Sequence, residues 1–196
     1  MSKRPPFERY FFERIIDSVS NLSRLGRQIQ EIVGELNSRG IRFALIGGLA
    51  LASHKVIRAT RDVDLLTDAH SADEVDSLLT NLGYQCIHRS ADAANYLRAD
   101  ERIDFLYASR PVARQLLAAA AEFKTPFGDL RVISTEGLIG FKLQGFINDP
   151  RRTQDLEDIR ALIKANRSTL NISEVQEYFL LFDREALLRE ILDANG

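Results

Sequence analysis

The chain has 196 residues, of which 45% are hydrophobic and 28% are charged, and its formal net charge is −2. This composition is typical of a soluble globular protein with one large domain, or one domain and a small appendage. The low net charge excludes bulk electrostatic attraction to nucleic acid or membranes, so binding to either would need a local patch. The single cysteine, Cys86, excludes a disulfide framework and a cysteine zinc site. Without a signal peptide or a long apolar run, we expect a cytoplasmic protein with no membrane partner.

Hydrophobic periodicity predicts the elements in the first part of the chain. Apolar residues at steps of three and four predict helix over residues 7–37, and Ser38-Arg39-Gly40 is a helix stop. A short apolar strand is expected over 43–46, followed by the pair Gly47-Gly48, a short helix over 49–54 and an alternating strand over 62–66. Ser71 is a good N-cap for a helix, and Gly83 is a glycine of the kind that marks a helix C-terminus.

The later part of the chain adds strands and then helices. Strands are predicted over 84–88, 95–98 and 102–107, followed by a helix over 111–121. Two more strands flank Gly128-Asp129, a hairpin signal, and helices follow over 134–146, over 151–165 and after Ser173. We therefore expect an α/β (α+β) fold: an N-terminal helical segment (1–40) packing on a core with a mixed, helix-flanked sheet (41–133), and a helical C-terminal region (134–196).

Three aspartates are candidates for a metal site. Side chains two apart on a strand share a face, so Asp62 and Asp64 should project together, away from the apolar side. Asp104 lies in the middle of a strand, opposite an apolar set, where a carboxylate is costly unless it is at an edge, paired or metal-bound. Adjacent carboxylates repel each other unless a cation lies between them, and Mg²⁺ suits oxygen ligands. Just upstream, Gly47 and Gly48 would let a phosphate approach backbone amides.

These residues resemble the nucleotidyltransferase-fold (polymerase β-like) superfamily, whose pattern is a glycine pair, two acidic residues one apart and a third on a neighbouring strand. The segment IGGLALASHKVIRATRDVDLLTD is most similar to the AbiEii/MenT-like branch, which contains toxins of bacterial toxin–antitoxin and phage-defence systems. Lys142 and the later Arg152, Asp155 and Asp158 look like that branch's lysine-plus-K/R-x-x-D-x-x-D-[IL] motif. The resemblance covers residues 40–165 and implies the superfamily's fold.

The resemblance implies Mg²⁺-dependent transfer of a nucleoside monophosphate from an NTP to an acceptor. Asp62 and Asp64 would hold two Mg²⁺ ions, and Asp104 would complete the metal site or take a proton from the acceptor hydroxyl. Gly47 and Gly48 would contact the β- and γ-phosphates through their amides.

Basic residues are expected to complete the nucleotide site. Lys142 would neutralise phosphate charge from a neighbouring helix, and Asp155 or Asp158 would orient Lys142 or an arginine. Arginines that would meet phosphates or an RNA acceptor are Arg58, Arg61, Arg151 and Arg152. The three histidines show no metal spacing and are read as structural.

The sequence allows three acceptors: a tRNA 3′ end, a protein hydroxyl, or a small molecule such as an aminoglycoside. It also allows an antitoxin partner. The alternative function is a non-catalytic module that binds a nucleotide or a partner on the same fold. A two-metal hydrolase is disfavoured because the histidine-rich ligand set common in such sites is absent. Each candidate also has a purely structural explanation. The strand aspartates would be solvated carboxylates, and Gly47 and Gly48 would only form a tight turn. Lys142 would be a surface lysine, and Asp155 and Asp158 would form ordinary helical ion pairs.

Overall fold

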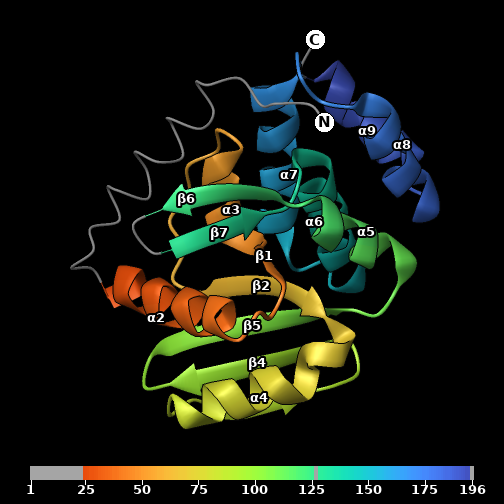
Figure 1. Ribbon diagram of the computed structural model, residues 1–196. Coiled ribbons are helices and arrows are strands. Elements are labelled where there is room, and N and C mark those ends of the chain that lie inside the picture. Colours follow the sequence, from red (N-terminus) through yellow and green to blue (C-terminus); the bar gives the residue numbers. More distant parts are fainter. Residues whose placement is uncertain (1–23, 126–127, 195–196) are drawn as a thin grey trace.

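A computed structural model describes residues 24–125 and 128–194 and contains one seven-stranded mixed sheet (Figure 1). The strand order is β3-β4-β5-β2-β1-β7-β6; β2 pairs with β5 and β1 with β7 in parallel, and the other neighbours are antiparallel. The strands are β1 (Phe43–Leu45), β2 (Val63–Asp68), β3 (Gln85–Arg89), β4 (Ala93–Arg98), β5 (Glu101–Ala108), β6 (Ala121–Thr125) and β7 (Gly128–Val132). This architecture confirms the mixed, helix-flanked sheet that the sequence predicts.

Helices surround the sheet and continue the chain after it. They are α2 (Arg24–Ser38), α3 (Gly47–Ser53), α4 (Ala72–Asn81), α5 (Pro111–Ala119), α6 (Thr135–Asn148), α7 (Thr153–Asn166), α8 (Ile172–Leu181) and α9 (Glu185–Asp193), with a 3-10 turn at Ala69–Ser71. Figure 1 shows α2 and α4 over one side of the sheet, with α6 and α7 packed together at the other side and α8 and α9 beyond them. None of the helices within the described ranges has the length and apolarity that crossing a membrane requires.

The sheet's two central strands bury one face and leave the other partly open. Val63 and Leu65 of β2 are buried, as are Ile103 and Phe105 of β5, whereas the residues between them are partly exposed. The alternation arises because successive side chains on a strand point to opposite sides. The side with Val63, Leu65, Ile103 and Phe105 packs in the core, and the opposite side carries Asp64 and Asp104, followed on β2 by the buried Leu66.

Several predicted boundaries change. The hairpin predicted around Gly128-Asp129 is confirmed, but these two residues pair with Thr125 and Lys124, so the predicted position of the turn is wrong. Asp62 precedes β2 instead of lying in it. The chain after Ser173 forms part of two helices, and Ser134 caps α6 as its sequence position indicates, accepting a hydrogen bond from the Gly137 amide. The helix predicted over residues 7–23 lies outside the described residues.

Candidate active site

Two carboxylates lie side by side on the partly open face of the sheet. Asp64 of β2 is the direct register partner of Asp104 of β5, and both side chains are partly exposed. β5 lies between β4 and β2, so Asp104 is not on an edge strand. Asp62 lies two residues before Asp64 and is also partly exposed. The register therefore brings together two of the three carboxylates that the sequence singles out, from segments 40 residues apart.

The ionised form of Asp64 is disfavoured in the folded protein. Burial is the largest cause and the negative charge of Asp104 the next, and together with Asp62 they raise the pKa of Asp64 from 3.8 to about 6. A hydrogen bond from the Gly48 amide and the charge of Lys142 lower that pKa and offset part of the effect. A cation placed among the three carboxylates would relieve the repulsion that raises this pKa.

The glycine pair packs directly against this carboxylate. Gly47 has a φ of +64°, in the left-handed region, and a Cβ there would overlap the Asp64 carboxyl group. A Cβ on Gly48 would meet the Thr60 hydroxyl at 2.8 Å and the Arg58 guanidinium at 3.0 Å. Each glycine is therefore required by close packing. Because the Gly48 amide already donates to Asp64, its predicted contact with phosphates stays a prediction.

Asp104 forms an ion pair with Arg102 that we did not predict from the sequence. The Arg102 Nε lies 3.0 Å and 3.1 Å from its two carboxylate oxygens, and the Asn95 Nδ2 donates to it at 2.8 Å. Arg102 and Asp104 are two apart on β5 and so share a face, which is the signal that could have predicted the pair. Within the described parts of the chain, no group of three His, Cys, Asp or Glu side chains is arranged to hold a metal. Asp104 is instead oriented by Arg102.

Lys142 lies in a buried ion-pair network. Its Nζ is 2.8 Å from Asp155 Oδ1 and 2.7 Å from Asp158 Oδ2, and all three residues are buried. Arg152 pairs with Asp155 at 2.6 Å, and Arg58 lies 3.2 Å from Asp158. The prediction that Asp155 or Asp158 orients Lys142 or an arginine is confirmed. Burial excludes a surface lysine, and a direct contact between Lys142 and phosphate stays a prediction.

The remaining basic and histidine residues fall in separate places. Arg61 is exposed and lines a small hollow together with Thr60 and Glu101, next to the start of α2. Arg151 is exposed and pairs with Asp149 at 2.8 Å. His54 is buried, with its Nε2 2.9 Å from the Ile133 carbonyl oxygen, as expected for a structural histidine.

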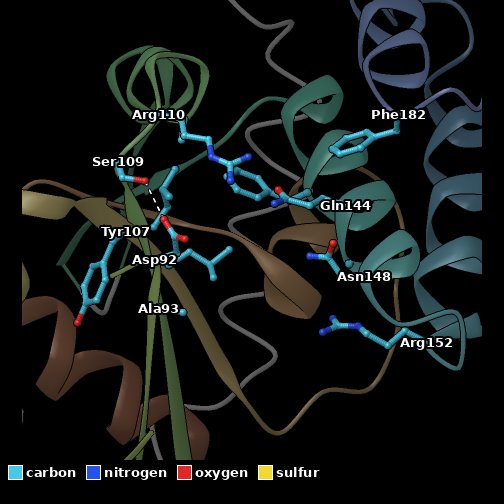
Figure 2. A pocket seen from close by; sticks show the side chains of 14 residues that line it. Asp92, Ala93, Tyr107, Ser109, Arg110, Gln144, Asn148, Arg152 and Phe182 are labelled. Carbon is cyan, nitrogen blue, oxygen red and sulfur yellow. Dashed lines mark hydrogen bonds between the residues drawn. The ribbon is translucent and has the colours of Figure 1, made fainter. Parts of the chain in front are cut away.

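A cavity of about 510 Å³ lies next to the paired aspartates, although neither Asp64 nor Asp104 lines it (Figure 2). Leu66 and Leu106 form part of its lining, and each lies two residues after one of the paired aspartates, Asp64 and Asp104. Arg152 also lines it, and Figure 2 shows its guanidinium extending into the cavity. Lining residues that the sequence did not indicate are Asp92, Ser109, Arg110, Gln144, Asn148 and Phe182. They come from separate segments, and no local pattern in the sequence connects them.

Comparison with known proteins gives the class of fold. A family model described as aminoglycoside-2''-adenylyltransferase matches residues 28–107. The solution structure of the antibiotic-resistance factor ANT(2'')-Ia superposes with a TM-score of 0.61 at 16% identity, covering 88% of this chain and all of that one (100%). The chain has the nucleotidyltransferase fold, as its sequence predicts.

Other solved structures agree with this fold. The lincomycin-bound lincosamide antibiotic adenylyltransferase LnuA has a TM-score of 0.53 at 16% identity, covering 69% of this chain and 94% of that one. An antigenic nucleotidyltransferase-like protein from Paracoccidioides brasiliensis has a TM-score of 0.53 at 18% identity, covering 87% and 92%. No curated protein matches the sequence. The matching family model is that of an adenylyltransferase, so placement in the AbiEii/MenT-like branch stays a prediction.

Proposed function

We propose that this protein transfers a nucleoside monophosphate from an NTP to a hydroxyl group of a small-molecule acceptor, in a reaction that requires Mg²⁺. The observation that carries the proposal is the side-by-side register of Asp64 and Asp104, two residues before Leu66 and Leu106, which line a cavity. The match to an adenylyltransferase family over residues 28–107, which include both aspartates, supports the same reaction class.

Asp62, Asp64 and Asp104 are the residues that would hold Mg²⁺, as a two-ion site. Their chemistry fits, because carboxylate oxygens are the preferred ligands and because burial, followed by the charges of Asp104 and Asp62, raises the pKa of Asp64. The bound ions would supply charge stabilisation for attack at the α-phosphate. For Asp104 to join the site, Arg102 has to leave its carboxylate, and the exposed position of Arg102 leaves it room to move.

The protein's other residues would bind and orient the nucleotide. Gly47 and Gly48 lie against Asp64 and bring backbone, without side chains, close to the position of the phosphates. Lys142 is fixed by Asp155 and Asp158 and places a positive charge near enough to Asp64 to lower its pKa. Arg61 and Arg152, which the sequence predicts as nucleotide-binding residues, would make further contacts with the nucleotide. Asp104 would accept the proton of the acceptor hydroxyl.

The solved relatives favour a small molecule as the acceptor. One relative was solved with adenylyl-2''-tobramycin and another with lincomycin. A tRNA or protein acceptor, and a toxin neutralised by an antitoxin, rest on the branch resemblance alone. A non-catalytic nucleotide-binding module would keep nucleotide affinity and transfer no label, which separates it from an enzyme.

The test is a transfer assay with each α-³²P-labelled NTP, Mg²⁺ and a set of acceptors: tobramycin, lincomycin and tRNA. We expect label on an acceptor with the wild type, and a loss of at least about a hundredfold in Asp64→Asn and Asp104→Asn. Asp68→Asn is the matched control, because Asp68 lies at the far end of β2 and pairs with His70. Absence of both transfer and nucleotide binding by calorimetry would refute the proposal, and near-wild-type transfer in Asp64→Asn would refute the metal assignment.

A further inference from the structure

The cavity beside the carboxylates carries a positive balance of charge. Its lining contains two guanidinium groups, from Arg110 and Arg152, and one carboxylate, from Asp92. Asp92 accepts a hydrogen bond from the Ser109 hydroxyl at 2.9 Å, and Arg152 pairs with Asp155 outside the lining. Among residues 24–125 and 128–194, no carboxylate pairs with Arg110, and Figure 2 shows its guanidinium extending toward Gln144 in the cavity. A ligand in this cavity therefore meets a free cationic group.

The position of the cavity relative to the aspartates suits the acceptor. The glycine pair packs on Asp64, whereas the cavity begins at Leu66 and Leu106, two residues further along the strands. In-line transfer requires the attacking oxygen and the leaving pyrophosphate on opposite sides of the α-phosphate. With the pyrophosphate next to the glycines, the cavity lies on the attacking side. This step rests on the proposed function.

The cavity also has an apolar part. Phe141 and Phe182 line it together with Leu66 and Leu106. A second hollow of about 120 Å³ shares Arg110 and both phenylalanines and adds apolar side chains from two helices, Val112 and Leu116 of α5 and Tyr178 and Leu181 of α8. The two hollows share these lining side chains, so an acceptor with an apolar or aromatic portion can place it against the two phenylalanines while its hydroxyl groups face the polar side.

We propose that the acceptor is a hydroxyl-bearing small molecule with an apolar portion and an anionic or neutral polar group, and that Arg110 selects it against polycations. A polycation would bring like charges next to two guanidinium groups, at a cost in affinity. The adenylyltransferase family match ends at Tyr107, before Arg110 and before the cavity wall formed by α5, α6 and α8. The wall that faces the acceptor is therefore outside the region that matches the aminoglycoside family.

Binding of a matched set of para-nitrophenyl glycosides tests this proposal. The glucoside, the glucuronide and the glucosaminide share an aromatic ring and sugar hydroxyls and differ in charge: neutral, anionic and cationic. We expect calorimetry with Mg²⁺ present to give the tightest binding for the glucuronide, then the glucoside, then the glucosaminide. Arg110→Gln should weaken the glucuronide by about tenfold, the size of one charge-assisted hydrogen bond, and leave the glucoside within about twofold. Arg110→Glu should invert the order.

Arg160→Gln is the matched control, because Arg160 lies on α7 outside the cavity and pairs with Glu157 and Glu190. Equal affinities, a preference for the glucosaminide or tobramycin, or no binding of any glycoside would overturn the proposal. An equal loss of NTP affinity in Arg110→Gln would also overturn it, since the cavity would then hold the nucleotide. Failure of the proposed function has a different signature: no NTP binding and no label transfer by the wild type, whatever the order of the glycosides.

Discussion

Replacing Asp64 with asparagine should stabilise the metal-free protein by an amount that depends on pH. Burial and the charge of Asp104 raise the pKa of Asp64 from 3.8 to about 6 in the folded state. At about 1.4 kcal/mol per pKa unit, this shift costs the folded protein up to about 3 kcal/mol once the carboxyl group is ionised. The folded pKa is the higher one, so this carboxyl contributes full stability below about pH 4 and loses it as the pH rises through about 6.

The assay is urea unfolding followed by circular dichroism, because the chain has no tryptophan for fluorescence. The difference in the free energy of unfolding between Asp64→Asn and wild type should grow from about pH 4 and level off above about pH 6.5, with EDTA present. Asp68→Asn is the control of opposite sign, since hydrogen bonds from His70 lower the pKa of Asp68 and its stabilising contribution is lost as the pH falls. A difference for Asp64→Asn that stays constant over this range would refute the reasoning.

Three further perturbations follow from the site. Lys142→Met should lower the free energy of unfolding by about 3–5 kcal/mol, because it removes the buried cation between Asp155 and Asp158 and leaves them only their pairs with Arg152 and Arg58; equal stability to wild type in urea unfolding would contradict this. Gly47→Ala should destabilise the protein by more than about 1 kcal/mol and abolish NTP binding by calorimetry, whereas the control Gly34→Ala, in an open position on α2, should be neutral or stabilising. Arg102→Gln should tighten Mn²⁺ binding in calorimetry, since a competing cation is removed from Asp104; weaker binding would show that Arg102 supports the metal site.

Local pattern is enough to predict much of this fold. The alternation of Asp104 with Ile103 and Phe105 indicates a strand whose carboxylate faces away from the core, and the structure has that arrangement. The direct pairing of Asp64 with Asp104 could not be predicted from local pattern. It depends on which strands become neighbours and at what register, and such long-range choices are made by packing of the whole sheet and not by nearby residues.

The parts that could not be predicted share this long-range origin. Arg110 gives no signal in the sequence, because its proposed role depends on Phe141 and Gln144, which α6 brings to the same cavity. The resemblance predicts that Asp155 or Asp158 orients Lys142, but no local pattern predicts the burial of all three residues, which their pairing makes tolerable. Gly128 suggests a turn by composition, yet the pairing of β6 with β7 places it in a strand.

The site crosses the division predicted at residues 133 and 134. The carboxylates belong to β2 and β5, but Lys142, whose charge lowers the pKa of Asp64, belongs to α6 and is held there by α7. The cavity is likewise closed on one side by the sheet and on the other by α6 and Phe182. In the proposed reaction a nucleotide and its acceptor meet at the carboxylates, so residues on both sides of this division would bind them. The helical region is therefore part of the proposed site, and it supplies the wall through which acceptor choice would change while Asp64 and Asp104 keep their register.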